Sequence, residues 1–209
     1  MKTKILYIFL LVILFTTNSK TAGSMEHGQD KIITDCSYTL SEALTGKEIP
    51  DEIKINLRLV DVVYYSFDNR LHAGQLVVHK DLVSDIKIIF KKLKEKKFPL
   101  QEVIPVVKYG WSDEESMQAN NSSAFNYRFV AGTTRLSNHS SGSAIDLNPK
   151  LNPQIINGIA SPKGAKYQST VLGTITKDSF FVKLFKELGW EWGGDWKTRA
   201  DYQHFQKIK

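Results

Sequence analysis

The stretch Ser137-Asn-His-Ser-Ser-Gly-Ser-Ala-Ile-Asp146, continued by Leu-Asn-Pro, decides the fold of this chain. Residues 143–148 alternate small or polar side chains with apolar ones and stop at a proline, which predicts a β-strand. Asp146 would then face one side of a sheet, with its apolar neighbours on the other. Gly142 permits the sharp turn that would swing the His139 imidazole back over that strand.

A second motif near the C-terminus, Asp201-Tyr-Gln-His204, completes a set of metal ligands. Two imidazoles and a carboxylate are the ligands of a catalytic zinc, which keeps a further position open for water. We expect His139, Asp146 and His204 to converge, with His204 on a neighbouring strand. Asp201 is expected in the turn leading into that strand, where it can take a proton from the water, whose pKa zinc lowers to about 7. This set predicts a metal-dependent hydrolase.

Such a hydrolase also needs a cation to stabilise the oxyanion or to hold a substrate carboxylate. Arg128, in Phe-Asn-Tyr-Arg upstream of the first motif, is the first candidate, and Arg135 is the second. The aromatic residues Trp192, Trp196 and Tyr202 either line the cleft or pack the end of the sheet, and the sequence leaves both interpretations open.

Short strands mixed with helices in no regular alternation predict an α+β fold, with an antiparallel central sheet and flanking helices. Apolar spacing and turn residues predict the remaining elements: a hairpin over 62–67 and 76–78, a helix over 82–93, a strand over 103–107, a short helix from Asp113, a long loop over 152–173 and a helix over 178–188. We expect one domain over residues 57–209, preceded by a leader over residues 24–56.

The N-terminus predicts export. Lys2 and Lys4 precede an apolar run over residues 5–15 and then small and polar residues, which is the pattern of a signal peptide over residues 1–23. The run is shorter than the ~20 residues that span a bilayer, so an uncleaved anchor is the less favoured alternative. We therefore expect a periplasmic or extracellular protein with no stable membrane insertion after cleavage. One cysteine excludes an intrachain disulfide.

The composition narrows the class of protein. The 209 residues are 42% hydrophobic and 24% charged, which excludes collagen-like, coiled-coil and disordered chains. The net charge of +6 can draw an exported protein to an anionic polymer or lipid surface of the envelope. The densest basic run, over residues 91–97, is typical of the solvated end of a helix, so no nucleic-acid partner is predicted. The oligomeric state is left open.

Three motifs carry a family resemblance: Ser137-x-His139-x-x-Gly142-x-Ala144-x-Asp146, Gly189-Trp190-x-Trp192-Gly193-Gly194-Asp195-Trp196, and Asp201-x-x-His204-Phe205. Together they resemble the zinc D-alanyl-D-alanine carboxypeptidase family, and most of all the branch that includes L-alanyl-D-glutamate endopeptidases. The resemblance implies the fold shared by these peptidases and the hedgehog signalling domain. It also implies hydrolysis of peptide bonds in peptidoglycan stem peptides. The site residues it implies are His139, Asp146 and His204 for zinc, Asp201 as general base, Arg128 for catalysis and substrate binding, and Ser137 and Trp196 as substrate contacts.

The scissile bond stays open at this point. A carboxypeptidase needs a closed, cationic pocket for a terminal carboxylate, whereas an endopeptidase needs an open groove. An alternative from another class is a non-catalytic, zinc-containing cell-wall binding module, and the presence of Asp201 argues against it. A serine carboxypeptidase is less well supported, because Ser84-Asp-Ile-Lys87 lies on an amphipathic helix and lacks the partner motifs. There is also no His-Glu-x-x-His motif.

Overall fold

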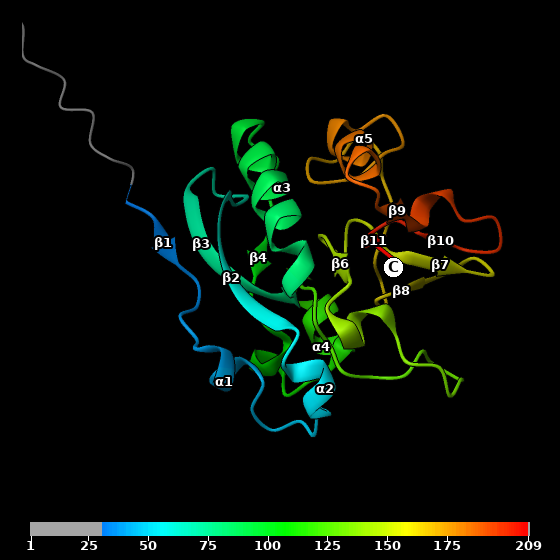
Figure 1. Cartoon of the computed structure of the whole chain (residues 1–209). Helices are drawn as coiled ribbons and strands as arrows, with labels where there is room; N and C mark the ends of the chain where they lie inside the picture. Colours follow the sequence, from blue (N-terminus) through cyan, green and yellow to red (C-terminus); the bar gives the residue numbers. More distant parts are fainter. Residues whose placement is uncertain (1–30, 209) are drawn as a thin grey trace, which may run out of the picture.

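The computed structural model describes residues 31–208, so the predicted signal peptide and the first residues of the leader lie outside the described part of the chain. The described residues form a mixed α+β structure with several small sheets and a few helices (Figure 1). The α+β class is therefore confirmed. Among the described residues, no helix combines the length and the apolar character needed to cross a bilayer.

The strands are β1 (Ile33–Thr34), β2 (Leu57–Tyr65), β3 (Leu71–His79), β4 (Glu102–Val103), β5 (Asn121–Ser122), β6 (Ala144–Asp146), β7 (Gln154–Ile156), β8 (Ile159–Ser161), β9 (Glu191–Trp192), β10 (Ala200–Asp201) and β11 (His204–Gln206). The α-helices are α1 (Leu40–Ala43), α2 (Asp51–Lys54), α3 (Val83–Glu95), α4 (Asp113–Gln118) and α5 (Phe180–Glu187). Short 3-10 helices cover Lys80–Leu82, Val106–Tyr109, Asn138–Ser141 and Gly193–Asp195.

The longest strands, β2 and β3, form the predicted hairpin, with Asp68 and Asn69 in its turn. Alternation along β2 places Val62 and Tyr64 in the main hydrophobic core with residues of α3. Leu57 belongs to a second cluster on the other face, which includes residues from the segment that carries α1. The hairpin is thus covered on both faces, and β1 extends it by pairing with β3.

Helices α3 and α5 contact each other and join the hairpin to the sheet of strands β6, β11 and β9 (Figure 1). One core cluster runs through all of these elements. Within it, Phe205 of β11 stacks on Phe185 of α5 with ring centroids 4.0 Å apart. The apolar sides of α3 and α5 pack with Ile145 of β6 and Phe205 of β11 in this core, and the opposite face of these two strands carries polar residues. The three predicted helices are present as α3, α4 and α5, although α5 begins at Phe180 after Ser179.

The strands do not merge into the single central antiparallel sheet that we expected. The described residues instead form separate sheets with the orders β1-β3-β2, β10-β7-β8, β6-β11-β9 and β4-β5. The β1–β3 and β4–β5 pairs are parallel. The predicted strand over 103–107 is reduced to β4, because Pro105 has no N–H to donate to a partner strand and is the N-cap of the 3-10 helix Val106–Tyr109.

The predicted loop over residues 152–173 is also partly wrong, because it contains the β7–β8 hairpin. Its turn is Asn157-Gly158, and both residues have positive φ angles, of 51° and 79°. That combination suits a tight two-residue hairpin turn. The hairpin pairs in turn with β10, which places Asp201 on a strand and not in the expected turn.

Candidate metal centre

His139, Asp146 and His204 lie together on the polar face of the β6–β11 pair. His204 begins β11 and stands directly opposite Asp146, the last residue of β6. His204 Nδ1 lies 2.9 Å from Asp146 Oδ1, His139 Nε2 lies 3.3 Å from Asp146 Oδ2, and the two imidazole nitrogens are 3.2 Å apart. The three side chains are buried, and each offers one ligand atom to a common point. This cluster can hold a metal ion.

His139 is aimed by the turn that precedes β6. The Ser137 hydroxyl accepts a hydrogen bond from the His139 backbone N–H and caps the 3-10 helix Asn138–Ser141. Gly142 ends this helix with a φ of +69°, and a Cβ there would lie 2.6 Å from the backbone nitrogen of His79. The His139 Nδ1–H donates to the carbonyl of Ala124, which leaves Nε2 facing the cluster as a ligand.

His204 is aimed by a chain of amide contacts. Its Nε2 lies 3.1 Å from Gln206 Oε1, and a donated hydrogen bond there leaves Nδ1 free as a ligand. The Gln206 side chain is fixed in turn, because Oε1 accepts a hydrogen bond from Asn138 and Nε2 donates one to Glu191. Each histidine therefore has one nitrogen occupied by the protein and the other directed at Asp146.

The electrostatics of the cluster suit a cation. Burial disfavours charge on Asp146, but the flanking His139 and His204 imidazoles hold the pKa of its carboxyl well below the usual range. Burial likewise opposes protonation of His204, yet the hydrogen bond to Asp146 raises the pKa of this imidazole. A buried carboxylate with two imidazole lone pairs is a nitrogen and oxygen donor set that fits zinc in number and type.

Asp201 is the second buried carboxyl group of the site. Its Oδ2 accepts a hydrogen bond of 2.6 Å from Gln154 on the paired strand β7, while its buried Oδ1 has no hydrogen-bond partner among the described residues. Burial raises the pKa of Asp201 to about 6; His204 opposes this shift and Asp146 adds to it. Gly193 packs so closely that a Cβ there would lie 2.5 Å from the Asp201 carbonyl oxygen.

Arg128 lies in the same cleft but is already paired. Its guanidinium contacts Asp113 at 2.9 Å, and its backbone N–H donates to the Ser140 hydroxyl next to the first histidine. Arg135, Ser137 and Trp196 also line this cleft, which has a volume of about 500 Å³. The Ser137 hydroxyl serves the turn, as described above. Of the aromatic residues with two open interpretations, Trp192 is buried in the core and Trp196 lines the cleft.

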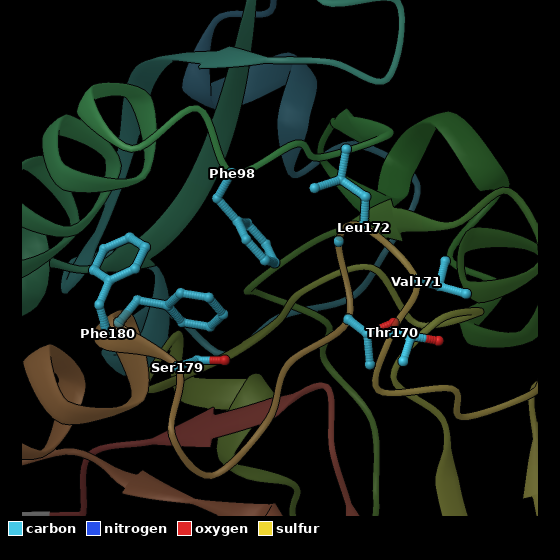
Figure 2. Close-up of a pocket in the computed structure, with 9 residues that line it drawn as sticks. Phe98, Thr170, Val171, Leu172, Ser179 and Phe180 are labelled. Atoms are coloured by element: carbon cyan, nitrogen blue, oxygen red, sulfur yellow. The ribbon is translucent and has the colours of Figure 1, made fainter.

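Several polar residues of the cleft were not singled out from the sequence, among them Gln154, Arg199, Gln203 and Gln206. A second hollow lies between Phe98, the 170–174 segment and the start of α5 (Figure 2). No residue that lines it is ionisable. Of these two cavities, the cleft with the His-Asp-His cluster is therefore the candidate for chemistry.

Comparison with protein families gives a match to part of the chain. The family model described as D-alanyl-D-alanine carboxypeptidase matches residues 131–207, which include the cluster, Asp201 and all of the glycine and tryptophan motif. No curated protein and no solved structure matched the chain. The match supports a metallopeptidase of this family; it spans 77 of the 209 residues, and the cleft residues Asp113 and Arg128 lie outside it.

Proposed function

We propose that this protein is a zinc metallopeptidase that hydrolyses peptide bonds in peptidoglycan stem peptides. The observation that carries the proposal is the convergence of His139, Asp146 and His204 with a second buried carboxyl group, Asp201, in one cleft. The match to the D-alanyl-D-alanine carboxypeptidase model supports the reaction class. From this match we also infer that the chain has the fold of that peptidase family and that it is exported to the cell wall, where its substrate is found.

The ligands would be His139 Nε2, an Asp146 carboxylate oxygen and His204 Nδ1, the atoms that face one another while the other nitrogen of each imidazole is hydrogen-bonded outside the cluster. Zinc bound there would act as a Lewis acid, activating water and polarising the scissile carbonyl. The oxygen donor Asp146 and the nitrogen donor His204 come from paired strands, and the second nitrogen donor, His139, comes from the 3-10 helix just before β6, so the three need little rearrangement to serve as ligands.

Asp201 acts as the general base. Its Oδ1 accepts no hydrogen bond from any residue between 31 and 208, so it is free to take a proton from the attacking water and to pass it to the leaving amine. Gln154 holds Oδ2 and so fixes which oxygen is available. Arg128, anchored by Asp113, stabilises the oxyanion or holds a substrate carboxylate, and Trp196 contributes an apolar wall.

The test combines metal analysis with digestion of peptidoglycan by the purified protein. We expect the purified protein to contain zinc. The products, separated by mass, distinguish the two activities: free D-Ala would indicate a carboxypeptidase, and a cut between L-Ala and D-Glu an endopeptidase. Asp201→Asn should keep zinc and lose activity by about a hundredfold or more. Asp178→Asn, at an exposed position, is the matched control and should behave as wild type.

The outcomes separate the proposal from its alternative. A wild-type protein that binds zinc and peptidoglycan but cleaves nothing would indicate the non-catalytic binding module. An Asp201→Asn variant that retains the wild-type rate would contradict the assigned base, even if hydrolysis itself is observed.

A further inference from the structure

We propose that Arg199, stacked on Trp196, forms a second anion-binding subsite that receives a free carboxylate of the substrate. The inference rests on the proposed function and deepens it, because it names a chemical feature by which the cleft would select its peptide. It concerns a residue outside the metal ligands, the base and the Arg128 pair.

Arg199 is placed in the cleft by an aromatic stack. Its guanidinium carbon lies 4.6 Å from the centre of the Trp196 ring, within the range of a cation–π contact. The same Trp196 ring lies 5.3 Å from the His204 ring, and all three side chains line the cleft. A layer of guanidinium, indole and imidazole thus leads directly from Arg199 to the metal cluster.

The charges of the cleft leave Arg199 available. Asp113 is paired with Arg128, Asp146 contacts the two imidazoles, and Asp201 is held by an amide. Within residues 31–208, no carboxylate lies within ion-pair distance of the Arg199 guanidinium. An arginine held by stacking and not by a carboxylate keeps the edge of its guanidinium group free for a bidentate contact.

The lining of the cleft indicates which kind of peptide Arg199 would receive. Apolar side chains of Val130, Ile156 and Ile208 line the same cleft, and Ile156 and Ile208 are well exposed. This combination suits a peptide in which a carboxylate lies next to small apolar side chains such as methyl groups. Two sources have that chemistry: an internal carboxylate, as on a γ-linked glutamate, and the terminal carboxylate of the peptide.

The experiment compares three synthetic stem peptides on the zinc-loaded full-length protein. One carries both carboxylates, one has the internal carboxylate replaced by a carboxamide, and one has the terminal carboxylate replaced. With the unmodified peptide, Arg199→Gln should lower kcat/KM by about tenfold, as expected for a hydrogen-bonded charged group. With the peptide that lacks the carboxylate bound by Arg199, wild type and Arg199→Gln should differ by less than about twofold. The modified peptide on which wild type and Arg199→Gln have the same kcat/KM identifies which carboxylate Arg199 binds.

Controls keep a structural effect apart from a binding effect. Lys197→Gln removes the same charge from an exposed position two residues away that does not line the cleft, and it should not distinguish the peptides. Arg199→Lys, which keeps the charge without the planar fork, should restore part of the rate. Equal losses on all three peptides, or no loss on any, would overturn the inference while leaving hydrolysis established. If the wild-type protein cleaves none of them, the proposed function fails, and the inference falls with it.

Discussion

Replacing Gln206 with leucine tests whether the amide chain behind His204 tunes the metal site. The change removes the acceptor at 3.1 Å from His204 Nε2 and leaves the donor groups of Asn138 and the acceptor of Glu191 without this partner. Loss of such an outer contact to a metal-binding histidine lowers metal affinity by about 10- to 100-fold. That corresponds to about 1.4–2.8 kcal/mol of binding free energy. Leucine has a volume similar to glutamine, so the fold should be retained.

The measurement is a competition titration, in which a chelator of known affinity removes zinc from wild-type and Gln206→Leu proteins. Gln101→Leu is the control, because the Gln101 side chain is exposed and away from the cluster. Circular dichroism and a urea melt would show that both variants are folded. An unchanged zinc affinity in folded Gln206→Leu would refute the reasoning, because it would mean that His204 is oriented without the amide chain.

Two further predictions concern Asp201. Its pKa in the folded protein is raised from 3.8 to about 6, so the folded state binds more protons than the unfolded state between these values, and the metal-free protein should lose stability as the pH rises through that window. In urea at pH 7 to 8, the free energy of unfolding of metal-free Asp201→Asn should therefore exceed that of wild type by at most about 3 kcal/mol. This difference should shrink below pH 4. A difference that does not change with pH would contradict a raised pKa. Gly193→Ala should force the backbone of Asp201 to move, because the added Cβ would lie 2.5 Å from its carbonyl oxygen, and should lower kcat by about 10- to 100-fold with zinc still bound. A normal kcat in this variant would show that the position of the base is not set by Gly193.

The elements that the sequence predicts well are those with many residues on one apolar face. The helix α3 and the β2–β3 hairpin repeat their apolar positions over enough residues to show a period. The convergence of His139, Asp146 and His204 was also predictable, because few other chemistries combine these residue types beside a short alternating strand. Local pattern therefore carries both the main core and the proposed ligand set.

The parts that escaped prediction depend on contacts between short, distant segments. Strands of two or three residues, such as β7 and β10, are too short to show alternation. Gln154 reaches Asp201 because these strands pair, and no spacing in the sequence links the two residues. One signal was present and not used: Asn157-Gly158 is typical of a hairpin turn and would have placed β7 and β8.

Arg199 escaped for a related reason. An arginine beside a tryptophan motif has no preferred partner until the fold brings their side chains together. The cationic residues predicted from the sequence, Arg128 and Arg135, lie upstream of the first histidine, and Arg128 is paired with Asp113 in the structure. The packing of a loop against a ring is a tertiary feature, and residue order alone does not indicate it.

The direct pairing of His204 with Asp146 gives the last strand a double role in folding. Along β11, His204 faces the cleft, and the next residue, Phe205, is fully buried in the core. A shift of one residue in this pairing would exchange the two side chains, placing an imidazole among aromatic rings and a phenyl group among the carboxylates. Misregistered chains would thus lose core packing and the proposed metal site together, so a metal ion at this site would be retained only by molecules in which β11 is correctly paired.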